Sequence, residues 1–164
     1  MPLALQLAEL LAYTGAERDK WRAWLLLHPE AMDVSVQPGN RHATVGKLID
    51  HIFLVERRHL QRLMDVAVAS VTGLTGNNAP PLFDYGASVR RELEQYVGDL
   101  DDEVAEQVRH FEIREQRWSI SPRKLLFHIV LHEIRHWAQV ALAVRNAGLE
   151  PPGEHDLVYS KALR

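Results

Sequence analysis

The chain has 164 residues, of which 46% are hydrophobic and 25% charged, a composition typical of one globular domain with a hydrophobic core. Its net charge of -3 argues against a general surface for nucleic acid, and the lack of cysteine excludes disulfides, thiolate ligands and a cysteine nucleophile. No segment has the pattern of a signal peptide or of a membrane-spanning helix. We therefore expect a single soluble domain over residues 1–164, located in the cytoplasm, with neither nucleic acid nor membrane as partner.

The first two predicted elements are helices separated by a loop. Leucine and tryptophan recur at helical spacing over residues 3–28. Residues 29–43 then form a loop, with a Pro-Gly-Asn turn at residues 38–40. Thr44 is a suitable N-cap for a second helix, which we expect to run to about Ser70.

Two more helices are predicted after a long linker. Glycine, asparagine and proline interrupt the helical pattern at residues 72–81, and a helix rich in charged residues is expected over residues 84–111. The last helix begins with Ser121 as N-cap and Pro122 at its first position, and it ends before Gly148. No segment shows the alternation of a strand. Four helices of about two dozen residues each imply an all-α fold, a four-helix bundle.

The pattern that most restricts the function is a pair of histidines in the last helix, His132 and His136. Side chains four residues apart share one face of a helix, so the two imidazoles are placed to bind one metal ion. A third ligand must come from another element, and His51 is the best candidate because it lies at the edge of the apolar arc of the second helix. Three neutral nitrogens suit a divalent transition metal, above all zinc or nickel, and leave coordination positions open for water or substrate.

Other side chains near this pattern are weaker candidates. His128 lies one turn before His132, but such rows drift by about 40° per step, so we expect it to line a cleft or to orient a ligand. Glu56 projects from the apolar arc of the second helix and needs a partner, which is a tryptophan N–H, an arginine or a ligating histidine. No ligand role is assigned to the remaining histidines, which are His28, His42, His59, His110 and His155.

Residues 132–136 also match the H-E-x-x-H signature of zinc peptidases, with Glu133 as general base. Such enzymes usually supply the third ligand downstream, where residues 150–155 offer the nearest candidates in a segment broken by glycine and proline. The extended zinc signature does not follow, and no strand is predicted beside which a peptide would bind. The peptidase is therefore one alternative. A second is a helical bundle without catalytic activity, a stress-related or regulatory dimer whose histidines form a surface stripe.

Three segments along the chain match one known family together. Residues 44–52, with Glu56 after them, contain a helix-two histidine followed by an acid. Residues 125–139 contain an H-x-x-x-H pair with a glutamine three residues on, and residues 144–148 form the helix ending. In these features the chain resembles the DinB/YfiT-like metalloenzymes. Residues 135–138 depart from the more frequent His-Arg-Gly-Gln sequence, which affects packing more than ligation.

The resemblance implies a four-helix bundle with a long connection between its second and third helices, corresponding to residues 72–81. It also implies a divalent metal held by His51, His132 and His136, a small-molecule substrate and a homodimer. Family members with assigned chemistry are thiol-dependent S-transferases or isomerases that use low-molecular-weight thiols such as mycothiol or bacillithiol. In them a metal lowers the pKa of the thiol. A low-molecular-weight thiol is thus an expected cofactor, and no catalytic residue is assigned.

Overall fold

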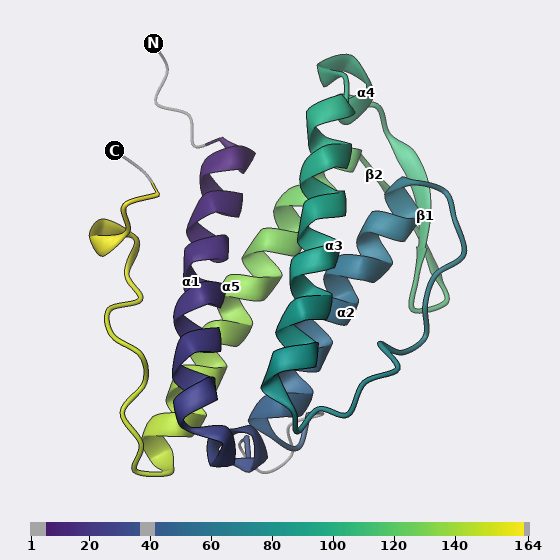
Figure 1. The fold of residues 1–164 in the computed structure, drawn as a ribbon. Coiled ribbons are helices and arrows are strands. Elements are labelled where there is room, and N and C mark those ends of the chain that lie inside the picture. The colour runs from purple at the N-terminus through teal and green to yellow at the C-terminus, as the bar shows by residue number, and fades with distance from the viewer. Residues whose placement is uncertain (1–5, 37–41, 163–164) are drawn as a thin grey trace.

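The computed structural model describes residues 6–36 and 42–162 and is mostly helical (Figure 1). In these residues the chain forms five α-helices, two short 3-10 helices and one two-stranded sheet. In chain order the elements are α1 (Leu7–Leu27), η1 (Pro29–Asp33), α2 (Val45–Leu63), α3 (Ala79–Asp99), α4 (Asp102–Glu106), β1 (Arg109–Ile113), β2 (Gln116–Ile120), α5 (Pro122–Asn146) and η2 (Leu157–Tyr159).

The long helices α1, α2, α3 and α5 have 19 to 25 residues each and enclose the core. α2 packs against α3 and α5, and α1 packs against the same two helices (Figure 1). Of these helix pairs, α2 and α5 make the most extensive contact. The hairpin of β1 and β2 lies beside α2 and leads directly into α5 (Figure 1). α2, α5 and the hairpin therefore share one surface.

Two apolar clusters fill the interior, with a charged layer between them. One cluster contains Trp21, Phe53 and Trp137, and the other contains Leu60 and Leu93. Each long helix contributes one residue to a buried charged cluster between the two apolar clusters, and these four are Arg18, Glu56, Arg90 and Glu133; Glu17 on α1 is buried as well. Burial of apolar surface drives the helices together, whereas buried charges are tolerated only with matched partners.

The N-termini of α2 and α5 are those predicted from the sequence. Thr44 Oγ1 accepts a hydrogen bond from the Lys47 backbone N–H at 3.3 Å, and Ser121 Oγ accepts one from the Lys124 N–H at 3.2 Å. Both side chains satisfy a donor that has no partner within the helix. Gly148 follows the end of α5 with a φ of 80°, a conformation that favours glycine. The two helices that carry the histidines therefore have well-defined ends.

The apolar run in α5 is a packed surface. Leu125, Val130 and Trp137 are buried among the other helices, whereas Arg135 is exposed. α5 therefore has one side packed in the interior and one side that faces solvent. Within the described part of the chain, no helix combines the length and the hydropathy that crossing a membrane would need.

The predicted helix over residues 84–111 is wrong at both ends. α3 begins at Ala79, since the two prolines that follow occupy the first turn, where a missing N–H costs nothing. It ends at Asp99, and the Asp101 side chain then accepts hydrogen bonds from two backbone N–H groups of α4. This new cap starts a separate short helix, so the long one does not continue.

The prediction that the chain has no strand is also wrong. β1 and β2 form an antiparallel hairpin in which Ile113 pairs with Gln116 across a two-residue turn. The turn residues Arg114 and Glu115 have φ of 52° and 60°, values that are usual for asparagine and glycine in such turns. Of the ten strand residues only Phe111 is buried, so the strands lack the apolar alternation that would have revealed them.

α2 is shorter than predicted, since it ends at Leu63 and not near Ser70. Asp65 takes a left-handed φ of 57°, which is incompatible with a continuing right-handed helix. Residues 64–78, which lead to α3, contain neither helix nor strand. Arg58 Nε donates a hydrogen bond to the Ala69 carbonyl at 2.8 Å and holds this segment against α2.

α1 agrees with the prediction within a few residues, beginning at Leu7 and ending at Leu27. The predicted loop that follows contains the short helix η1 and an isolated bridge between Ser35 and Thr44. The turn predicted at residues 38–40 lies outside the described residues, as does Leu3.

Candidate metal centre

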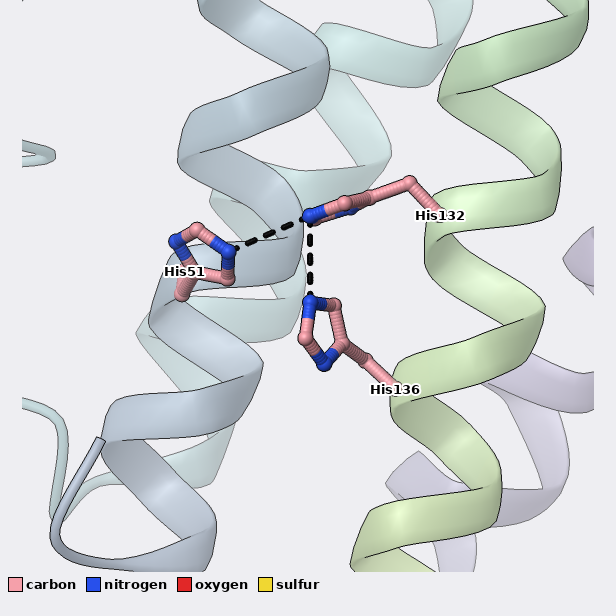
Figure 2. Close-up of side chains that lie close together, drawn as sticks. All are labelled: His51, His132 and His136. Carbon is pink, nitrogen blue, oxygen red and sulfur yellow. Dashed lines mark hydrogen bonds between the residues drawn. The ribbon is translucent and has the colours of Figure 1, made fainter. Parts of the chain in front are cut away.

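The structure brings together the three histidines singled out from the sequence. His51 projects from α2 toward His132 and His136 on successive turns of α5 (Figure 2). The Nε2 atoms of His51 and His132 are 3.2 Å apart, and those of His132 and His136 are 3.0 Å apart. One nitrogen of each residue lies within 4.8 Å of the other two. A group of this size could hold one metal ion.

Two of the three separations match those between ligands of one metal ion. Nitrogen ligands at about 2.0–2.1 Å from zinc are about 3.0–3.4 Å from one another in common coordination geometries. The observed 3.0 and 3.2 Å fall in this range. All three side chains are partly exposed, so the ligands leave one side of the site in contact with solvent. The cluster is therefore compatible with metal binding at an open site.

The three imidazoles are neutral at physiological pH. Burial, and then the neighbouring His136 and His51, lower the pKa of His132 to about 2. Burial, and then the neighbouring His42, His136, Arg58 and Arg114, lower the pKa of His51 to about 3. Burial also lowers the pKa of His136, against the opposing effect of a hydrogen bond to Gln139. Neutral rings keep the lone pairs that a metal requires.

Gln139 sets the orientation of His136. Its Oε1 lies 2.7 Å from Nδ1 of His136, one turn earlier on α5. An amide oxygen only accepts hydrogen bonds, so Nδ1 carries the proton and Nε2 presents a lone pair to the other two histidines. The glutamine that the sequence placed three residues after the pair thus has a direct contact with the site.

Three further histidines surround the cluster. The ring of His128 lies 5.7 Å from that of His132, and the ring of His59 lies 5.3 Å from that of His128. His42, to which no role was assigned, stacks on His51 with ring centroids 4.0 Å apart. Because His42 belongs to the segment before the cap of α2, helical spacing gave no signal for its position.

All six of these histidines line a cleft with a volume of about 1040 Å³. α2 and α5 form two of its walls, and the hairpin of β1 and β2 contributes Arg114, Trp118 and Ile120 to a third. Since the hairpin was not predicted, this third wall of the cleft was not predicted either. The cleft gives the open side of the histidine cluster room for a small molecule.

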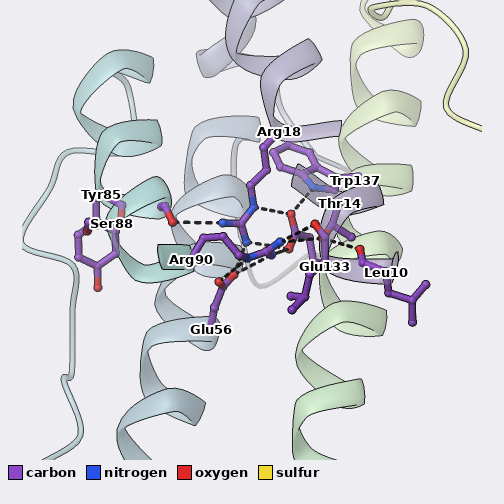
Figure 3. Close-up of polar contacts among 11 residues, drawn as sticks. Leu10, Thr14, Arg18, Glu56, Tyr85, Ser88, Arg90, Glu133 and Trp137 are labelled. Carbon is purple, nitrogen blue, oxygen red and sulfur yellow. Dashed lines mark hydrogen bonds and ion pairs between the residues drawn. The ribbon is translucent and has the colours of Figure 1, made fainter. Parts of the chain in front are cut away.

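Glu133 follows His132 in the sequence but points into the core (Figure 3). Its carboxylate accepts hydrogen bonds from Arg18 Nε and Arg18 Nη2 at 2.7 Å each, from Arg90 Nη2 at 2.7 Å and from Trp137 Nε1 at 2.9 Å. Only 1% of the residue is exposed. The general base of an H-E-x-x-H peptidase has to reach a water on the metal, and this carboxylate is fully engaged elsewhere. In this geometry Glu133 cannot act as the general base that the peptidase alternative requires.

Glu56 joins Glu133, Arg18 and Arg90 in the buried charged layer. It accepts a hydrogen bond from Arg90 Nε at 2.9 Å and another from Arg18. Among the partners considered for Glu56, the structure shows arginine. Although burial opposes the charged form, Arg18 and Arg90 keep the pKa of Glu133 below its usual value. Two carboxylates and two guanidiniums thus balance within the core.

Arg18 and Arg90 were not predicted from the sequence. Arg18 Nη1 donates to the Gly86 carbonyl at 3.2 Å, and Arg90 Nη1 donates to Thr14 Oγ1 at 2.9 Å. The sequence held one indication of their burial, because each arginine, like Glu133, lies one helical turn before a residue of the core. Only the tertiary pairing, however, identifies the partners. The cluster ties α1, α2, α3 and α5 together one residue away from His132.

Comparison with known protein families gave a match over nearly the whole chain. The sequence matches the family model of the DinB family over residues 1–162, a range that includes the three clustered histidines and the four residues of the buried charged cluster. Comparison with curated proteins gave no match. The family match extends over nearly the whole chain, and the protein therefore belongs to the DinB family.

Proposed function

We propose that this protein is a divalent-metal-dependent enzyme acting on a small molecule, with His51, His132 and His136 as metal ligands. The observation that carries the proposal is the convergence of three neutral imidazole nitrogens, at separations of 3.0 and 3.2 Å, in an open cleft. Three protein ligands with an open position are characteristic of catalytic zinc sites, whereas structural sites use four. Imidazole donors suit zinc, nickel, iron and copper, and zinc or nickel is the proposed metal.

The proposed reaction is a thiol-dependent S-transfer or isomerisation that uses a low-molecular-weight thiol. Support comes from the resemblance to DinB/YfiT-like enzymes and from the match to the DinB family. A metal at this site supplies a Lewis acid that lowers the pKa of a bound thiol or water. The chain contributes the ligand geometry, in which Gln139 orients His136, and the walls that limit access of water.

The proposed architecture is a single DinB-type four-helix bundle that forms a homodimer in the cytoplasm. α1, α2, α3 and α5 are the four long helices, and residues 64–78 are the long connection between the second and the third. Sedimentation equilibrium of the purified protein tests the dimer. A mass of one chain, 18.7 kDa, over the whole concentration range would contradict it.

Metal analysis tests the ligand set. The wild-type protein is expected to bind about one equivalent of zinc, and His132→Ala is expected to lose it. His110→Ala is the matched control, because His110 lies on β1, contacts Ser119 and does not line the cleft. Circular dichroism shows whether each variant is folded. Equal zinc affinity in folded His132→Ala and wild type would contradict the proposed site and favour the bundle without catalytic activity.

Turnover is tested with the zinc-loaded protein, a low-molecular-weight thiol and an electrophilic acceptor. Thioether formation is expected to cease after chelation of the metal and to return when zinc is added. A rate that does not change on chelation would contradict metal dependence.

A further inference from the structure

The cleft above the three histidines is positively charged, although the whole chain carries a net charge of -3. Among the described residues that line it, one side chain is a carboxylate, Asp50, and six are cationic. The six cations are Lys47, Arg58, Arg62, Arg114, Lys124 and Arg135. The lining histidines add little positive charge at neutral pH, since burial lowers the pKa of five of them, which are His51, His59, His128, His132 and His136.

The cations come from all three walls of the cleft and lie near the histidines. Arg58 projects from α2, Arg114 from the hairpin turn and Arg135 from α5. After burial and the neighbouring histidines, Arg58 and Arg114 are among the groups that lower the pKa of His51. Arg135 acts in the same way on His136. The positive field therefore covers the site itself and not only the rim of the cleft.

None of the six cations forms an ion pair with a carboxylate within residues 6–36 and 42–162. Arg58 donates to the carbonyls of Ala69 and Ser70, and Arg62 Nε donates to the Glu112 carbonyl at 2.7 Å. Carbonyl acceptors hold a guanidinium in place without cancelling its charge. Uncompensated cations in a walled cleft raise the local concentration of anions.

Arg114 has a backbone conformation that is unfavourable for arginine. Its φ of 52° and the φ of 60° at Glu115 form a turn that asparagine and glycine adopt more readily. Arg114 lines the cleft, whereas Glu115 does not. The turn thus holds this arginine at the tip of the hairpin, on the wall of the cleft.

The polar lining continues along the cleft away from the three histidines. Lys124 precedes His132 by eight residues, which is about 12 Å along a helix axis. On the facing helix α2, His59 also lines this part of the cleft. It is 5% exposed, and its Nδ1 has no hydrogen-bond partner in the described part of the chain. A ligand about 10 Å long would contact the histidine cluster at one end and further cations at the other.

We propose that the cleft binds a small molecule that carries a carboxylate or phosphate group, with Arg114 and Arg135 among the cations that contact it. This identification of the substrate or cofactor class rests on the enzyme function proposed above. The binding of the anion itself requires no metal. Three neutral ligands would also leave the charge of a divalent ion uncompensated, which adds to the attraction.

Two double variants with the same loss of charge test the proposal. Arg114→Gln with Arg135→Gln removes two cations of the cleft. Arg117→Gln with Arg145→Gln is the control, since it removes two arginines from the same hairpin and the same helix that do not line the cleft. Binding is measured by calorimetry at low ionic strength on protein freed of metal and dialysed. Inorganic phosphate and succinate are the anionic probes, and succinamide is the uncharged control.

The wild type and the control variant are expected to bind phosphate or succinate, and neither is expected to bind succinamide. The cleft variant is expected to bind the anion about tenfold more weakly, because each lost cation weakens a partly exposed contact about threefold. The stronger of the two anions identifies the phosphate or the carboxylate as the preferred group. Equal affinity in the two double variants would overturn the proposal, as would the absence of anion binding to the wild type.

Zinc binding is measured separately on the same variants. The cleft variant retains all three histidines, so it is expected to bind zinc as the wild type does. A protein that binds anions in the cleft but no zinc would contradict the proposed function alone. A protein that binds zinc but shows no difference between the double variants would contradict the anion site alone.

Discussion

The charged layer in the core predicts that Glu133→Gln destabilises the fold without removing a metal ligand. Glu133 accepts four hydrogen bonds, three of them from Arg18 and Arg90. Glutamine has nearly the same shape, but it offers one acceptor oxygen and turns an NH2 group toward the remaining guanidinium donors. The cluster then holds two guanidinium charges against the single carboxylate of Glu56.

The size of the effect follows from this imbalance. Removing one partner from a buried ion pair costs about 3–5 kcal/mol, because the opposite charge stays buried without compensation. For a chain of this length about 1 kcal/mol lowers the melting temperature by about 2–4 °C, so a decrease of roughly 6–20 °C is expected. The two arginines lower the pKa of Glu133, so its contribution is present above the unfolded value of about 4.3. The difference between wild type and variant should therefore shrink as the pH falls below about 4.

Urea denaturation followed by circular dichroism measures the free energy of unfolding. Glu92→Gln is the control, because Glu92 pairs with Arg57 at 2.6 Å at the surface, with its side chain 46% exposed. That variant is expected to lose at most about 1 kcal/mol. Zinc binding to folded Glu133→Gln should match the wild type. A loss of stability no larger than that of Glu92→Gln would refute the structural role of Glu133 and return it to candidacy as a catalytic base.

Further expectations concern packing, ligand orientation and pH. Gly86→Ala places a Cβ 2.8 Å from the Phe53 ring and should cost about 1–3 kcal/mol in urea denaturation, whereas Gly98→Ala, which meets nothing within 4 Å, should gain about 0.5 kcal/mol. Gln139→Leu removes the acceptor of a ligand N–H and should weaken zinc binding about 10–100-fold in competition with a chelator; unchanged affinity would contradict its orienting role. Burial, and then Arg62, lower the pKa of His59 to about 3 from 6.5, so stability should fall as the pH decreases from about 6.5 toward 3. Denaturation at pH 7 and 5.5 should show a smaller loss for His59→Gln than for the wild type.

The histidine cluster was predictable because its information is local. His132 and His136 share a helix face by spacing alone, and the position of His51 at the edge of an apolar arc placed it in a contact between helices. The starts of α2 and α5 were equally accessible, since Thr44 and Ser121 cap the helices through their own side chains. Such features depend on residues within one or two turns of each other.

The features that were missed depend on contacts between distant parts of the chain. Arg18 and Glu133 are 115 residues apart, so no local pattern shows that they pair. The hairpin was missed because its turn residues, Arg114 and Glu115, are not those that mark a tight turn and because its faces are largely exposed. The position of His42 beside His51 depends on a bridge between Ser35 and Thr44 that only the folded chain reveals.

The adjacency of His132 and Glu133 links the interior of the protein to the geometry of its cleft. Successive residues on a helix point about 100° apart, so α5 holds an imidazole toward the cleft and a carboxylate toward two arginines at the same height. Any rotation or sliding of α5 that moved the histidines would pull Glu133 away from Arg18 and Arg90, at a cost in buried charge. Apolar packing alone would resist such movements of the helix less, because it has little directional preference. The charged layer therefore limits how far α5, and with it His132 and His136, can rotate or slide.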